Sequence, residues 1–238
     1  MKRIFTAAVF IFAFTTCSIS SFAQSESRED LLRKIESKRA ELQALENKFL
    51  AASEEDAAAY AEFLQQPDTG LTRLLPRETY DNKNSLTVRG GGAYYSFTRR
   101  THEYGWGTQI GFEQDTLGVS FAGADYGMLA RLGDVPLNTI TLDSAAAKFL
   151  ASYEPPSEEP LARSEYSRFA TGVKVEGILY KTHQTAIVNN TYVLRGIHYS
   201  DSDVLVTFRI VRKDSDDSLI ILWKMLRKYP KPVLARAN

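Results

Sequence analysis

The chain has 238 residues, and its 29 lysines and arginines are balanced by 29 aspartates and glutamates, so its formal net charge at neutral pH is zero. A balanced charge provides no single-sign field to attract nucleic acid or an anionic membrane, which argues against both as partners. Hydrophobic residues make up 44% of the chain and aromatic residues 11%, a composition typical of a folded globular protein.

The first 23 residues have the three parts of a cleavable secretory signal. Lys2 and Arg3 are followed by an apolar run over 4–14 and then by small residues that end at Ala23. The apolar run has about 11 residues, fewer than the roughly 20 that a membrane-spanning helix needs. We therefore expect cleavage after Ala23, an exported product in the periplasm or outside the cell, and no transmembrane span after cleavage.

The single cysteine of the chain, Cys17, lies within this signal segment. Cleavage after Ala23 leaves a mature chain without cysteine, which excludes disulfides, thiolate nucleophiles and cysteine-bound zinc. The alternative is a lipid anchor on Cys17, as in bacterial lipoproteins, although the residues before Cys17 differ from the usual processing site.

Residues 25–66 are predicted to form an amphipathic helical segment. Its apolar side chains recur at alternating steps of four and three, the heptad pattern of coiled coils, with Lys38 at the one polar seam position. The repeat lasts about three heptads, which is compatible with a homo-oligomer or with one helix packed on its own domain. The apolar residues of the predicted self-association seam are Leu31, Ile35, Leu42, Leu45 and Phe49.

Residues 67–85 are interpreted as a linker, after which strand-like patterns begin at Leu86. Gly90-Gly91-Gly92 favours a tight turn, because a tyrosine-rich strand follows it rather than a helix N-terminus. An alanine-rich stretch over 144–152 favours a short helix, and the proline-rich segment 153–162 favours an exposed loop. Short candidate strands, separated by glycines as in antiparallel hairpins, cover 86–89, 93–100, 108–113, 116–121, 128–132 and 138–142.

The last third of the chain is the most strand-like, with candidate strands over 173–180, 185–188 and 191–199 and two stronger runs. In 204–213 apolar residues alternate, which predicts a half-buried strand, whereas the continuous apolar run at 219–226 predicts a strand covered on both faces. The acidic loops 201–203 and 214–217 favour turns, and 227–238 is predicted to be an extended tail. The whole pattern predicts an α+β fold, in which an N-terminal helix precedes a mostly antiparallel β domain over 86–226.

Aromatic and basic residues between positions 94 and 106 form the candidate binding site. Tyr94, Tyr104 and Trp106 can stack on a sugar ring or an aromatic partner, and Arg99 adds a positive charge. The other interpretation is that these are ordinary residues of strands, where tyrosine is common.

The sequence contains no catalytic motif that we recognise. It has neither a Gly-x-Ser-x-Gly elbow nor a Ser-x-x-Lys pair. Its three histidines, His102, His183 and His198, lack the close spacing of a zinc site, so we expect no metal and no cofactor. The leading hypothesis is a non-enzymatic exported module that binds or assembles, and the alternative is a small exported hydrolase that uses one of these histidines with nearby carboxylates.

Overall fold

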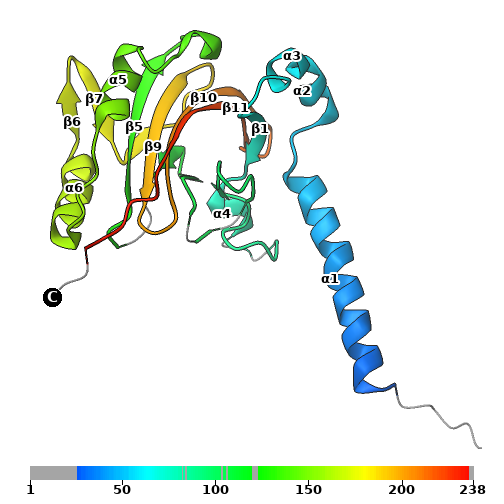
Figure 1. Ribbon diagram of the computed structural model, residues 1–238. Coiled ribbons are helices and arrows are strands. Elements are labelled where there is room, and N and C mark those ends of the chain that lie inside the picture. Colours follow the sequence, from blue (N-terminus) through cyan, green and yellow to red (C-terminus); the bar gives the residue numbers. More distant parts are fainter. Residues whose placement is uncertain are drawn as a thin grey trace, which may run out of the picture. The chain divides into compact units, whose positions relative to one another are not determined.

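The computed structural model describes residues 26–81, 83, 85–102, 104–105, 107–119 and 123–235 (Figure 1). These residues form a mixed α+β structure with antiparallel sheets, which confirms the predicted fold class. The chain divides into two compact units, one up to Leu42 and one from Gln43 onward. The signal segment 1–23, including Cys17, lies outside the described residues.

Three helices occupy the segment predicted to be helical. Helix α1 spans Arg28–Leu50, α2 spans Glu54–Ala59 and α3 spans Ala61–Leu64. Ser53 begins α2 through a capping box, in which its side chain accepts from the backbone amide of Asp56 and the Asp56 carboxylate accepts from the backbone amide of Ser53. Because Ser53 begins a separate helix, the predicted helical segment 25–66 is divided after α1 and is not one continuous helix.

The larger sheet has seven antiparallel strands in the order β1-β11-β10-β9-β5-β7-β6. Strands β9, β10 and β11 are consecutive in the chain and pair as antiparallel neighbours. Short turns connect them, as antiparallel pairing allows. The strands are β1 Thr69–Leu74, β5 Tyr126–Gly133, β6 Val173–Val175, β7 Ile178–Lys181, β9 Thr191–His198, β10 Ser202–Lys213 and β11 Leu219–Tyr229.

A second sheet of four short antiparallel strands has the order β2-β3-β4-β8. Its strands are β2 Tyr94–Tyr95, β3 Ile110–Glu113, β4 Thr116–Gly118 and β8 His183–Thr185. Short connections complete the unit, namely the one-turn helix α4 Arg77–Tyr80 and the 3-10 helix η1 Leu137–Thr139.

The two faces of the seven-stranded sheet contact different partners. One face packs against the second sheet, and here Val204, Val206, Phe208 and Ile210 of β10 lie in one apolar core, as their alternation predicts. The other face packs against α5 Ala145–Ser152 and α6 Glu159–Thr171, which Figure 1 shows beside β5 to β7. The sheet is therefore covered on both sides, and Leu219–Trp223 is buried, as predicted for that run.

Several predicted boundaries need correction. The predicted linker contains β1, which pairs with β11 along its whole length. The predicted strand 86–89 is a series of bends and turns, and the predicted strand 138–142 is replaced by η1. In the predicted loop 153–162, α6 begins at Glu159 with Pro160 in its first turn, a position where proline is favoured. Strand β11 continues to Tyr229, so the extended tail begins after it.

Within the described part of the chain, none of the helices combines the length and the apolar character that crossing a membrane requires.

Candidate functional site

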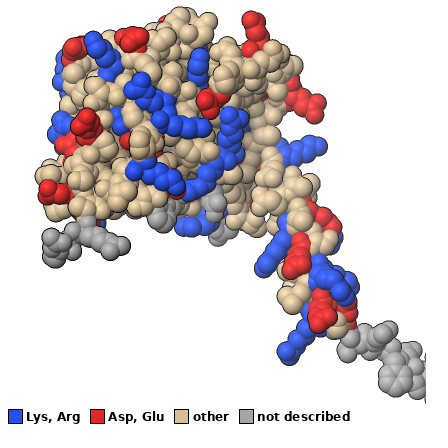
Figure 2. Space-filling model, in the orientation of Figure 1, with Lys and Arg blue, Asp and Glu red and all other residues tan. Residues whose placement is uncertain are grey.

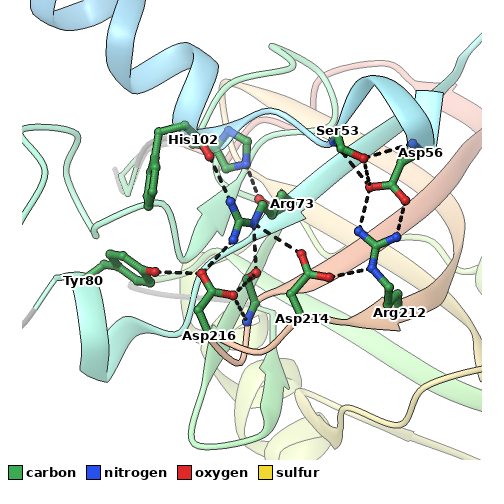
Figure 3. Close-up of polar contacts among 10 residues, drawn as sticks. Ser53, Asp56, Arg73, Tyr80, His102, Arg212, Asp214 and Asp216 are labelled. Carbon is green, nitrogen blue, oxygen red and sulfur yellow. Dashed lines mark hydrogen bonds and ion pairs between the residues drawn. The ribbon is translucent and has the colours of Figure 1, made fainter. Parts of the chain in front are cut away.

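Arg73, on edge strand β1, is the centre of a polar network that joins four separate segments (Figure 3). Its guanidinium donates to the Ser218 hydroxyl at 2.9 Å, to Asp216 Oδ2 at 2.7 Å and to the carbonyl of Phe49 at 3.2 Å. The phenol hydroxyl of Tyr80 donates a hydrogen bond to the same Asp216 oxygen at 2.7 Å. The network thus fixes the end of α1, β1 and α4 to the turn between β10 and β11.

Asp216 is ionised in this network. Its partial burial raises the pKa of the carboxyl, but hydrogen bonds from Ser218 and Tyr80 and the charge of Arg73 outweigh burial and lower the pKa to about 2. The carboxylate is therefore charged at neutral pH and accepts hydrogen bonds from Arg73, Tyr80 and Ser218.

A second ion pair extends the network to α2. Arg212 of β10 donates from Nη2 to Asp56 Oδ2 at 2.8 Å and from Nη1 to the other carboxylate oxygen, and its Nε donates to Asp214. The hydrogen bond from Arg212 is the main cause of the lowered pKa of Asp56. Because Ser53 also donates to Asp56, this pair fixes the cap of α2 to the sheet.

His102 is a half-buried, neutral side chain that lies against β1. Its Nε2 is 2.6 Å from the carbonyl oxygen of Arg73 and 3.1 Å from the hydroxyl of Thr72. A carbonyl oxygen can only accept, so Nε2 carries the proton and Nδ1 is left as an acceptor. Burial lowers the pKa of His102 to about 4, which keeps the ring uncharged at neutral pH.

A cavity of about 660 Å³ lies beside His102. It is bounded by the last two turns of α1, by β1 and by two loop segments, 87–89 and 100–102, all within the unit that begins at Gln43. Its volume is within the range of about 300–1,000 Å³ usual for small-molecule sites. Two arginines, Arg89 and Arg100, are the charged residues among its described lining, which includes no carboxylate.

The predicted binding residues that the structure describes lie in two different environments. Tyr94 and Tyr104 pack together with ring centroids 4.7 Å apart, and Tyr94 is only 5% exposed, so its ring faces a neighbour rather than solvent. Arg99 forms an ion pair with Asp201. Trp106 lies outside the described residues. Tyr94 and Tyr104 therefore form a packed pair, whereas Arg99 lies in an ion pair.

The three histidines occupy separate sites and share no hydrogen-bond partner among the described residues. His102 lines the cavity described above, whereas exposed His183 contacts the hydroxyl of Thr182 at 2.9 Å. His198 is buried on β9, with Nδ1 3.6 Å from Asp125 Oδ2, and lines a different cavity of about 560 Å³. The three histidines therefore do not converge on one site, and His198 is the one with a carboxylate oxygen of a described residue within 4 Å. Across the described ranges, no group of three or more histidine, cysteine, aspartate or glutamate side chains is placed to hold a metal ion.

The predicted seam residues of α1 are accessible. Leu31, Ile35 and Leu42 are between 42% and 46% exposed, and Leu45 is 67% exposed. Phe49 is 40% exposed but also packs edge-on against Tyr80. The apolar stripe is therefore open over the first part of the helix and partly covered at its end.

Comparison of the chain with models of known families, with curated proteins and with solved structures found no match.

Proposed function

We propose that this chain is an exported, non-enzymatic module that assembles through α1 and presents a ligand cavity near the end of that helix. The observation that carries the proposal is the heptad stripe of α1, whose leucine and isoleucine side chains remain exposed. Exposed apolar side chains in a regular stripe are a usual mark of an interaction surface. Export is inferred from the signal pattern of residues 1–23.

A second copy of α1 is the partner that best fits this stripe. With Leu31 at heptad position d and Ile35 at a, Leu42 falls at a and Lys38 at d. Two such helices bury their a and d positions against each other and exclude water from them, and the lysine within the seam selects the register at some expense of stability.

Charges beside the seam favour an antiparallel pair. Figure 2 shows both signs along α1, and the charges next to the seam include Lys34 and Glu41 at position g and Arg39 at e. A parallel pair would place Lys34 opposite Arg39 of the other copy, whereas an antiparallel pair that faces Leu31 with Leu42 places Lys34 opposite Glu41. Opposite charges at these flanking positions set the orientation of coiled coils.

The separate placement of the histidines supports this proposal over a hydrolase that uses two of them together. A general base must lie within hydrogen-bond reach of the group that it activates and usually needs a third residue to orient it. His102, the histidine beside the larger cavity, donates its proton to a backbone carbonyl, and its closest side-chain partner is a threonine.

Sedimentation velocity on the exported protein over a range of concentrations tests assembly. We expect a species larger than a monomer at micromolar concentration, and the variant Leu31→Gln/Leu42→Gln should shift it to monomer. Leu161→Gln is the matched control, because Leu161 is a similarly exposed leucine on α6. A monomeric wild type, or an unchanged size in the double variant, would contradict the proposal.

Mass spectrometry of the same exported protein tests the localisation. The proposal predicts a mature chain that begins at Gln24. A chain that begins at a lipidated Cys17 would replace the free product with an anchored one, and an unprocessed N-terminus would argue against export.

A further inference from the structure

We infer that the cavity between α1, β1 and the segments 87–89 and 100–102 binds a small organic anion, through a carboxylate or phosphate group. The inference rests on the binding role proposed above and assigns the chemical class of the ligand. The charge, the hydrogen-bonding groups and the apolar surface of the cavity support an anion site.

Arg89 and Arg100 supply the positive charge. Both are exposed, and neither forms an ion pair or a side-chain hydrogen bond with a described residue. Each lies instead over an aromatic ring: Arg89 is 5.7 Å from the centroid of Tyr104, and Arg100 is 5.2 Å from that of Trp223. A guanidinium placed over an aromatic ring keeps N–H groups that can still donate to a carboxylate or a phosphate.

This arrangement differs from that of the other arginines near the cavity. Arg73 and Arg212 are each neutralised by aspartates in the polar network. Glu46 of α1 is buried and does not line the cavity, and its carboxylate accepts hydrogen bonds from the backbone amide and the hydroxyl of Thr87. Glu103, which follows His102 in the sequence, lies outside the described residues. The described lining therefore has a net positive charge.

The remaining surface fits an organic body rather than a bare ion. Leu50, Leu71 and Val88 provide apolar surface in the same cavity. Tyr95 adds a phenol whose pKa burial raises to about 12, so it stays protonated and can donate. His102 adds the opposite function, since its Nδ1 has no partner among the described residues and can accept a hydrogen bond from a ligand hydroxyl or amide. A ligand with one anionic group, one donor and an uncharged body would satisfy all of these groups.

The test uses matched pairs of probes and the assembled protein. Isothermal titration calorimetry compares octanoate with octanamide and phenyl phosphate with benzyl alcohol, and inorganic phosphate alone reports on a free-ion site. We expect at least one organic anion to bind more tightly than its neutral counterpart and than inorganic phosphate. The variant Arg89→Gln/Arg100→Gln should weaken that binding by about tenfold or more, because charge-assisted hydrogen bonds are lost.

Arg131→Gln is the control, because Arg131 is also exposed, has no ion pair among the described residues and does not line the cavity. As a second readout, the bound anion should protect Arg89 and Arg100, but not Arg131, from modification by phenylglyoxal in peptide mass spectrometry. Circular dichroism should show that the double variant is folded, since neither arginine is buried.

Each other outcome overturns the inference. No binding of any anion, equal binding of the neutral probes, equal binding of inorganic phosphate, or binding that the double variant retains would each contradict an organic-anion site. These substitutions leave the α1 seam intact, so the sedimentation of the double variant should match that of wild type. Failure of the ligand test with normal assembly therefore rejects this inference alone, and tight binding of a neutral probe would leave a binding module of another ligand class.

Discussion

Arg195 and Asp203 form a bidentate ion pair inside the protein, with Nε 2.9 Å from Oδ1 and Nη2 2.8 Å from Oδ2, and each side chain is 2% exposed. The same guanidinium donates to the backbone carbonyls of Leu150 and Tyr153 and lies 3.8 Å from the ring centroid of Tyr229. One charged residue of β9 thus connects β10, the end of α5 and the end of β11.

Replacing one member of the Arg195–Asp203 pair should lower the free energy of unfolding far more than replacing both members together. Asp203→Ala leaves a buried, uncompensated guanidinium and should lower the free energy of unfolding by about 3–5 kcal/mol in urea denaturation. Arg195→Met/Asp203→Leu should be less destabilised than the sum of the single variants. Glu159→Gln, which breaks an exposed pair with Arg163, should change stability by less than about 1 kcal/mol. Additive effects of the buried substitutions would show that the pair is not coupled.

Gly92 lies where a side chain would collide with the core residues Leu50 and Leu75. Its φ is +79°, and a Cβ there would lie 2.4 Å from Leu50 Cδ2 and 2.9 Å from Leu75 Cδ1. Gly123 has a similar φ of +72°, but a Cβ there would meet nothing within 4 Å. Both Gly→Ala variants carry the strain of a left-handed backbone, about 1–2 kcal/mol. Gly92→Ala should lose roughly 1–3 kcal/mol more from overpacking, and thermal unfolding of the two variants measures this difference. Equal destabilisation would contradict close packing at the end of α1.

His102 predicts a specific pH dependence of stability. Its pKa is about 4 in the folded protein and 6.5 as a model value, so the unfolded chain binds more protons between these values. The free energy of unfolding should therefore fall as the pH drops from about 6.5 to 4, by at most about 1.4 kcal/mol per pH unit from this group, and the contribution should level off below.

Urea unfolding across this range tests the dependence by comparison with His102→Phe. The free energy of unfolding of wild type minus that of His102→Phe should decrease steadily as the pH falls from about 6.5 to 4. The control His183→Gln removes an exposed ring and should leave the profile of wild type unchanged. A difference that is constant with pH would show that His102 is not held in its neutral form.

The charges that flank the α1 seam predict which way two copies pair. In the antiparallel arrangement Lys34 faces Glu41 of the other copy, so Lys34→Glu should weaken self-association and Lys34→Glu/Glu41→Lys should restore it. In a parallel pair Lys34→Glu would face Arg39 and strengthen association instead. Sedimentation equilibrium measures the sign of the effect, and strengthening in the single variant would refute the antiparallel arrangement.

Regular local patterns in the sequence were sufficient for the central strands. The continuous apolar run from Leu219 predicted burial on both faces correctly. The alternation in Val204–Lys213 correctly placed Val204, Val206 and Phe208 on one core face, but the prediction of a half-buried strand was wrong, because Leu205 on the opposite face is buried in the core under the helices. The prolines of 153–162 concealed the start of α6, although Pro160 is favoured in a first helical turn. Edge strand β1 was missed because Thr69–Leu74 has no clear alternation and owes its structure to pairing with β11.

The candidate site could not be predicted in the same way. Arg89 and Arg100 come from two separate loops, and Leu50 and Leu71 come from a helix and a strand. Only tertiary contacts bring these groups to one cavity. The acidic turn 214–217 gave a partial signal, but its role as acceptor for Arg73 required the pairing of β1 with β11.

The contact proposed between two copies of α1 is tested directly by a spin label at Ser37. A mature chain that begins at Gln24 has no cysteine, so Ser37→Cys carries the label at one position. Ser37 is close to the midpoint of the antiparallel register, and two packed helices are about 10 Å apart. Pulsed dipolar spectroscopy should therefore detect two labels within roughly 25 Å of each other, allowing for helix and label size. That signal should vanish when Leu31→Gln/Leu42→Gln is added, whereas the absence of any short distance in the otherwise wild-type seam would contradict the account.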